Sequence, residues 1–177
     1  NYIFIVMSNL LCDSVVPRHV REFAESNVKK ALAIGAMKLN IFIPFQGVKF
    51  FNKSKTAGYV FSGDDSIVYL NLELLKKNSE HFANDTIPHE VAHLFAYRLN
   101  KREAHHGKTW KKIMQNVFGL EPKRCHDLDT TGVGRDTQSF KYICACKKHI
   151  VGKIRHNKME KGAKYRCASC YKTLTFL

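Results

Sequence analysis

Apolar residues recur at helical spacing in three segments of the chain: residues 17–37, 85–100 and 108–118. A helix formed by any of these segments would have an apolar face and a polar face, as in helices that pack against a core. Asp85 or Thr86 stands where a side chain could cap the second of these helices. The pattern therefore predicts three long amphipathic helices.

Between the first two helices the pattern changes to short, strand-like runs. Residues 40–51 read as one strand, and residues 57–72 as two short strands joined by a turn at 62–65. Residues 72–78 form a short helix in this interpretation. The strand around 66–71 is expected to offer a free edge, to which an extended peptide can add as a further strand.

This order of elements predicts an α+β fold, in which helices and a small, mainly antiparallel sheet form one domain and a small β module follows. We expect an N-terminal extension at 1–16, the main domain at 17–128, a linker at 129–140 and the module at 141–177. The residues before Met7 are expected to be dispensable. No apolar run approaches the ~20 residues that a membrane-spanning helix needs, and no export signal is recognisable. We therefore expect a cytoplasmic monomer that does not contact membranes.

Positive charge is concentrated in the last module. Residues 141–177 contain ten Lys or Arg and a single acid, Glu160, so +9 of the formal charge of +14 lies there. So basic a module favours a nucleic-acid partner, DNA first, which would bring the protein to the nucleoid; the alternative is a solubilising surface. The residues expected to contact nucleic acid are Lys147, Lys148, Lys153, Arg155, Lys158, Lys164 and Arg166.

The segment "PHEVAHLFAYRL" (88–99) carries the first candidate chemistry. His89 and His93 are four residues apart and so lie on one face of a helix, where both imidazoles can reach one Zn²⁺. Glu90 points in a neighbouring direction, from which it can take a proton from a metal-activated water. The alternative is an ordinary helix that carries two surface histidines.

A catalytic zinc ion needs a third protein ligand and one open position. The candidates downstream are Glu103, His105, His106 and His126. His106, next to Gly107 in a polar turn, is the predicted ligand, and His105 is the alternative. His126 is expected to be a partner near the metal, a general acid or a structural histidine.

Four of the six cysteines lie in the last 34 residues. Cys167 and Cys170 have the spacing of a zinc knuckle. Cys144 and Cys146 are predicted to complete the site, with His149 as an alternative ligand. The ion would hold together a module too small to fold on an apolar core alone. The chain is thus expected to bind two Zn²⁺ ions, one catalytic and one structural.

These motifs together resemble the SprT-like zinc metalloprotease family. The resemblance is carried by "PHEVAHLFAYRL…HHGKTWKKIMQNVFGLEPKRCHDLD", by the upstream hairpin "TAGYVFSGDDSIVYLNLELL" and by "YICAC…YRCASCYKTL", which looks like the family's zinc ribbon. It is closest to bacterial SprT proteins and more distant to the Spartan proteases. It implies a zincin-like metalloprotease domain with a C-terminal zinc ribbon, zinc bound by His89, His93 and His106, and catalysis by Glu90. For the Spartan branch it also implies proteolysis of proteins crosslinked to DNA.

The expected function is therefore a zinc-dependent endopeptidase that acts on nucleic-acid-associated proteins, with DNA–protein crosslinks among its substrates. The alternative is a regulatory protein that binds zinc and nucleic acid without cutting protein. Replacing Glu90 separates the two, because only the protease needs a proton acceptor at this position.

Overall fold

The computed structural model describes residues 15–52, 54–61, 66–133 and 138–177. The predicted N-terminal extension lies, up to residue 14, outside the described residues. The predicted turn at 62–65 lies outside them as well.

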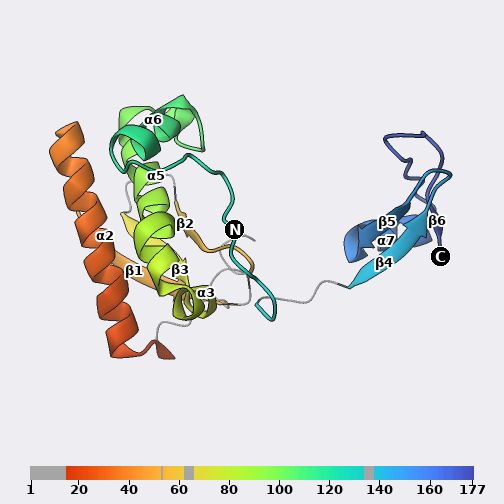
Figure 1. Cartoon of the computed structure of the whole chain (residues 1–177), viewed down its shortest axis with the longest axis horizontal. Helices are drawn as coiled ribbons and strands as arrows, with labels where there is room; N and C mark the ends of the chain where they lie inside the picture. Colours follow the sequence, from red (N-terminus) through yellow and green to blue (C-terminus); the bar gives the residue numbers. More distant parts are fainter. Residues whose placement is uncertain (1–14, 53, 62–65, 134–137) are drawn as a thin grey trace. The chain divides into compact units, whose positions relative to one another are not determined.

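The chain forms two compact units, Asn1–Gly134 and Arg135–Leu177 (Figure 1). The division falls inside the predicted linker at 129–140. Val133 is still buried in the core of the first unit, and the first strand of the second unit begins at Ser139. Among the described residues, no helix is both long enough and apolar enough to cross a bilayer.

Two long helices form the frame of the first unit. Helix α2 (Arg18–Leu39) ends at Asn40, which adopts a left-handed conformation with φ 53°, and helix α5 (Ile87–Leu99) packs against it. A Cβ on Gly35 would lie 2.1 Å from Cε2 of Phe95. The glycine in α2 therefore makes room for the phenylalanine of α5, and the two helices pack in close contact (Figure 1).

The sheet of the first unit has three strands, β1 (Gly47–Phe51), β2 (Gly58–Val60) and β3 (Ile67–Asn71), in the order β1-β3-β2. β1 pairs with β3 in parallel and β2 pairs with β3 in antiparallel orientation. The second unit adds two antiparallel pairings, so three of the four pairings between described strands are antiparallel. The α+β fold class is confirmed.

Two predictions about these strands were wrong in detail. The strand predicted at 40–51 begins only at Gly47, after a segment that contains Pro44, a residue without a backbone N–H for a sheet ladder. The strand around 66–71 is not an edge. It is β3, the central strand, because β1 pairs with its other side. β1 and β2 are the two edge strands, since among the described residues each pairs only with β3.

The chain enters α5 through a continuous set of short helical turns. These are α3 (Leu72–Lys77), α4 (Ser79–His81) and the π-helical turn η2 (Phe82–Thr86). The prediction that Asp85 or Thr86 caps α5 was wrong: Thr86 has helical φ and ψ and makes no capping hydrogen bond. The N–H of Ile87 instead donates to the carbonyl of Phe82, so the preceding turn supplies the acceptor that a cap would have supplied.

A short connection returns the chain from α5 to the third predicted helix. The 3₁₀ turn η3 (Lys101–Glu103) leads to α6 (Lys108–Asn116). Helix α6 buries Trp110, Ile113 and Met114 against the core. Gly119 follows shortly after the end of the helix, and its φ of 69° is the left-handed conformation that glycine commonly adopts there.

The second unit is a small antiparallel sheet with one helix. Strands β4 (Ser139–Ile143), β5 (Lys148–Gly152) and β6 (Thr175–Phe176) have the order β5-β4-β6, and α7 (Lys153–Glu160) follows β5. The buried Tyr142 shares a hydrogen bond of 2.9 Å between its hydroxyl and Nδ1 of His156. This tyrosine belongs to the core of the unit.

Candidate metal centre

Three imidazoles converge in the first unit. His89 and His93 lie one turn apart on α5, with ring centroids 5.0 Å apart. Nε2 of His106 lies 3.1 Å from Nε2 of His89. Each of the three histidines offers a ligand nitrogen, and these atoms all lie within 4.8 Å of one another. The structure thus brings together the three residues predicted to bind zinc.

The turn between α5 and α6 selects His106 rather than His105. His106 has a φ of 54°, a left-handed conformation that is uncommon for a residue with a Cβ. The carboxylate of Glu103 accepts hydrogen bonds from N and Oγ1 of Thr109, at 3.1 and 2.7 Å, and so ties the turn to the start of α6. The alternative ligand His105 is not among the converging donors in the described structure.

Neighbouring groups orient the imidazole of His93 and anchor the backbone of His89. Nδ1 of His93 lies 2.6 Å from the carbonyl oxygen of Ala104. A carbonyl only accepts, so Nδ1 carries the proton and Nε2 keeps its lone pair for a metal. Nε1 of Trp110 donates to the carbonyl of His89 at 3.3 Å, and this holds the ligand-bearing turn of α5.

Trp110 is a site residue that the sequence identified only as a member of a helix face. Its ring centroid lies 4.7 Å from that of His89, 5.3 Å from that of His93 and 4.6 Å from that of His106. It is fully buried and forms an apolar wall behind all three imidazoles. The signal available in the sequence was its place in the "HGKTW" segment, three residues after Gly107.

Burial keeps the imidazoles neutral. It lowers the pKa of His89 to about 3 and that of His93 to about 4, and it also lowers the pKa of His106. The neighbouring imidazoles lower the pKa of His89 further. Neutral imidazole is the form that binds a metal. Three neutral nitrogen donors on one side of a cleft fit a Zn²⁺ ion with one position left for substrate or water.

Glu90 is buried beside these ligands, with a side chain 6% exposed. Burial raises the pKa of its carboxyl to about 8. A divalent cation close by favours the ionised form of a carboxyl. In a site loaded with metal, Glu90 would therefore be available as a proton acceptor near neutral pH.

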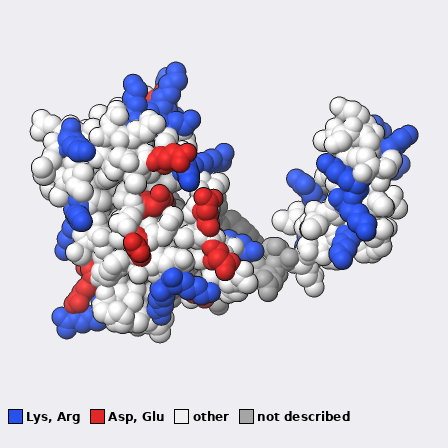
Figure 2. Space-filling view, viewed as in Figure 1, with Lys and Arg blue, Asp and Glu red and all other residues white. Residues whose placement is uncertain are grey.

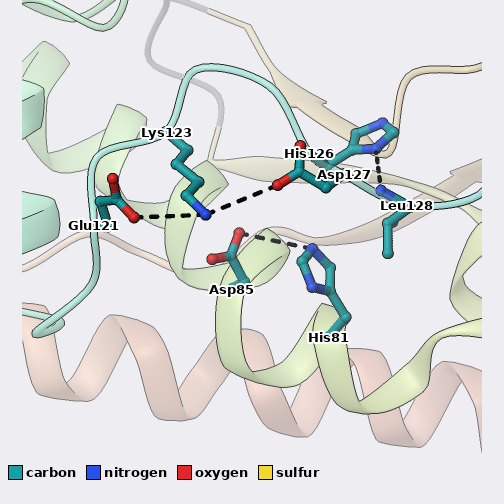
Figure 3. Close-up of polar contacts among 7 residues, drawn as sticks. All are labelled: His81, Asp85, Glu121, Lys123, His126, Asp127 and Leu128. Atoms are coloured by element: carbon teal, nitrogen blue, oxygen red, sulfur yellow. Dashed lines mark hydrogen bonds and ion pairs between the residues drawn. The ribbon is translucent and has the colours of Figure 1, made fainter.

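A cleft of about 750 Å³ opens over the three histidines and Glu90. Strand β2 lines one wall, and residues 123–126 line another. In Figure 3, His126 lies on this second wall. Its Nε2–H donates to the carbonyl of Lys55 at 3.0 Å, and its Nδ1 accepts from the N–H of Leu128 at 3.3 Å. Nε2 thus joins this segment to the residues just before β2, and Nδ1 holds the local turn at Leu128. Because both ring nitrogens have partners, a structural role is favoured for His126.

The same wall carries a small network of charges. Nζ of Lys123 lies 3.5 Å from Glu121 and 3.8 Å from Asp127 (Figure 3). In the short helical turns before α5, Nε2 of His81 lies 3.8 Å from Asp85. The side chains of Glu121, Lys123 and Asp127 are more than half exposed, so these two ion pairs add little to stability.

Four cysteines converge in the second unit. The sulfurs of Cys144, Cys146, Cys167 and Cys170 all lie within 4.8 Å of one another. The alternative ligand His149 lies beside them, with Nε2 3.1 Å from Sγ of Cys144. Four thiols at this spacing fit a closed, tetrahedral structural zinc site.

Local hydrogen bonds favour the metal-binding thiolate form at Cys144 and Cys167, whereas at Cys146 the hydrogen bonds with Cys144 and Cys170 raise the pKa to about 12. Burial raises the pKa of Cys144, but the hydrogen bond with His149 and nearby backbone groups outweigh it and lower that pKa to about 5. Backbone N–H groups of Cys170 and Ser169 lower the pKa of Cys167 to about 7. Thiolates at neutral pH are the ligands that Zn²⁺ requires.

The basic side chains of the second unit face solvent (Figure 2). All of the predicted nucleic-acid contacts are exposed: Lys147, Lys148, Lys153, Arg155, Lys158, Lys164 and Arg166. Lys147, Arg155 and Arg166 line one hollow of about 250 Å³. The exposed ring of Tyr171 and the half-exposed ring of Phe176 belong to the same unit.

Comparison with known proteins agrees with this geometry. The sequence profile of the SprT-like family matches residues 33–126, which include all three histidines and Glu90. The chain belongs to the SprT-like family. Protein SprT of Escherichia coli K12 is 34% identical over 158 residues, which cover 89% of this chain and 94% of that protein. Protein SprT of Shigella dysenteriae serotype 1 is 33% identical with the same coverage. No solved structure matches the chain significantly.

Proposed function

We propose that this SprT-like protein is a zinc-dependent endopeptidase of the HExxH type. One observation carries the proposal: three neutral imidazole donors and a buried carboxyl, Glu90, meet at an open cleft. A purely structural zinc site would close around its ion with four protein ligands. The described donors of this site number three, and the cleft is large enough to admit a peptide.

The residues of the cleft divide the chemistry between them. Zinc held by the three histidines would supply Lewis-acid polarisation of a peptide carbonyl and activation of a water. Glu90 takes the proton of the attacking water and passes it to the leaving amine. The carbonyl of Ala104 holds the imidazole of His93 in its metal-facing orientation, and Trp110 anchors the main chain at His89. The buried indole keeps water from the rear of the ligands.

Strand β2 is suited to bind the substrate backbone. It is one of the two edge strands of its sheet, and it is the one that lines the cleft. An extended peptide that adds to this edge forms main-chain hydrogen bonds regardless of sequence. The scissile peptide would then lie over α5, within the cleft that contains Glu90. The peptide-binding edge that the sequence predicted for the strand around 66–71 is therefore proposed for β2 instead.

We propose proteins associated with nucleic acid, and DNA–protein crosslinks among them, as the substrates. The support is the exposed basic surface of the second unit, which would hold the enzyme on nucleic acid through phosphate contacts. Exposed Tyr171 and Phe176 add rings on which bases can stack. The second candidate, a non-proteolytic regulatory protein, is favoured by the same basic surface and needs no chemistry at Glu90.

A cleavage assay distinguishes the two functions. The full chain and its Glu90→Gln variant are incubated with a DNA-binding protein, alone and with single- or double-stranded DNA, and zinc per chain is measured for both. We expect DNA-stimulated cleavage by the wild type and a loss of about 100-fold or more in the variant, with zinc retained. Binding of DNA without cleavage by either protein would support the regulatory function instead.

A further inference from the structure

Gly58, on the edge strand β2, lies close to Glu90. A Cβ built on Gly58 would lie 3.0 Å from Cγ and 3.2 Å from Oε1 of Glu90, and 3.2 Å from the carbonyl oxygen of Tyr69. The φ of Gly58 is outside the left-handed region, so its backbone conformation is open to any residue. A side chain at position 58 would therefore clash with Glu90, although its backbone conformation would be allowed.

The ladder shows which way the backbone of Gly58 faces. The N–H of Asn71 donates to the carbonyl of Ala57 at 2.8 Å, and Gly58 stands opposite Leu70 in the antiparallel register. Hydrogen-bonded and non-hydrogen-bonded pairs alternate along an antiparallel ladder. Gly58 and Leu70 are therefore a non-hydrogen-bonded pair. The N–H and C=O of Gly58 point away from β3, toward the edge on which the described residues place no further strand.

We propose that Gly58 is a positioning residue that joins the peptide-binding edge to the catalytic carboxyl. This inference rests on the proposed protease function. Because Gly58 has no side chain, β2 approaches until its backbone is in contact with Glu90. A substrate residue that pairs with the outward N–H and C=O of Gly58 is thereby held beside the carboxyl that acts on it. The glycine thereby determines which residue of the bound peptide lies beside Glu90.

An alanine at position 58 has little freedom to relieve the contact. One of the three close atoms, the carbonyl oxygen of Tyr69, belongs to the backbone of the central strand, so β2 cannot retreat without weakening its ladder. The Glu90 side chain must then give way by a few tenths of an ångström. Proton transfer and attack are sensitive to displacements of this kind, because they require reacting atoms in near-attack positions.

The kinetic test uses Gly58→Ala in the full chain. We expect kcat to fall by about tenfold or more while KM changes less than threefold and both zinc ions are retained. Gly152→Ala is the matched control, since a Cβ at Gly152 meets no atom within 4 Å and its φ is −73°. The control should keep wild-type kcat and KM. A Gly58→Ala variant with wild-type kcat would overturn the inference.

A cycle of unfolding measurements tests the contact without relying on proteolysis. Glu90→Ala removes both side-chain atoms that a Cβ at position 58 would meet. Gly58→Ala should therefore lower the urea midpoint in the wild-type background and lower it clearly less in the Glu90→Ala background. Equal shifts in the two backgrounds would refute the contact. Absence of cleavage by the wild type would refute the proposed protease function, and the cycle would still report on Gly58.

Discussion

Replacing Glu90 should change how the stability of the metal-free protein depends on pH. Burial raises the pKa of this carboxyl from 4.5 to about 8, so the folded chain holds a proton that the unfolded chain has released. The stabilisation is fully present below about pH 4.5 and is lost as the pH rises toward 8. Glu90→Gln keeps the shape of the side chain and cannot ionise, so its stability should not show this loss.

The size of the effect follows from the two pKa values. The gap between 4.5 and about 8 corresponds to roughly 5 kcal/mol, at about 1.4 kcal/mol for each tenfold change. Most of this stabilisation is lost between pH 5 and pH 9. Over that range the wild type should lose on the order of 4 kcal/mol of unfolding free energy relative to Glu90→Gln.

Urea unfolding of the chelator-treated proteins, followed by tryptophan fluorescence, measures this difference. Trp110 is the single tryptophan of the chain and is fully buried in the first unit, so its signal reports on the unit that contains Glu90. Restoring zinc should shrink the difference between the two proteins, because a nearby cation favours the carboxylate. The reasoning fails if both metal-free proteins show the same change in stability from pH 5 to pH 9.

Metal analysis should find two zinc ions per chain, with one lost in His93→Ala and the other lost in Cys167→Ser; one zinc in the wild type would contradict two separate sites. His149→Ala should keep the second ion, because four cysteine sulfurs already converge, and loss of that ion would make His149 a ligand. Removal of residues 135–177 should weaken DNA binding and flatten its dependence on salt, since +9 of the formal charge lies within 141–177; a salt titration that matched the full chain would show the basic surface to be only solubilising.

Local sequence determined the features of this protein that depend on neighbours along the chain. Helices α2, α5 and α6 could be predicted because apolar residues that pack against a core recur every three to four positions along a helix. His89 and His93 share a face because they are four residues apart in a helix. Cys167 and Cys170 could be paired for the same kind of reason, since two intervening residues allow two thiolates to reach one ion.

Only the tertiary structure decided what depends on contacts between distant segments. The parallel pairing of β1 with β3 made β3 the central strand and left the edge beside the cleft to β2, which short alternating runs of apolar residues cannot reveal. The left-handed turn at His106 chose that residue over His105. The approach of Gly58 to Glu90 joins residues of two elements that no periodicity relates. Such contacts arise from the path of the loops and the packing of the core, and these are properties of the whole unit rather than of any local stretch.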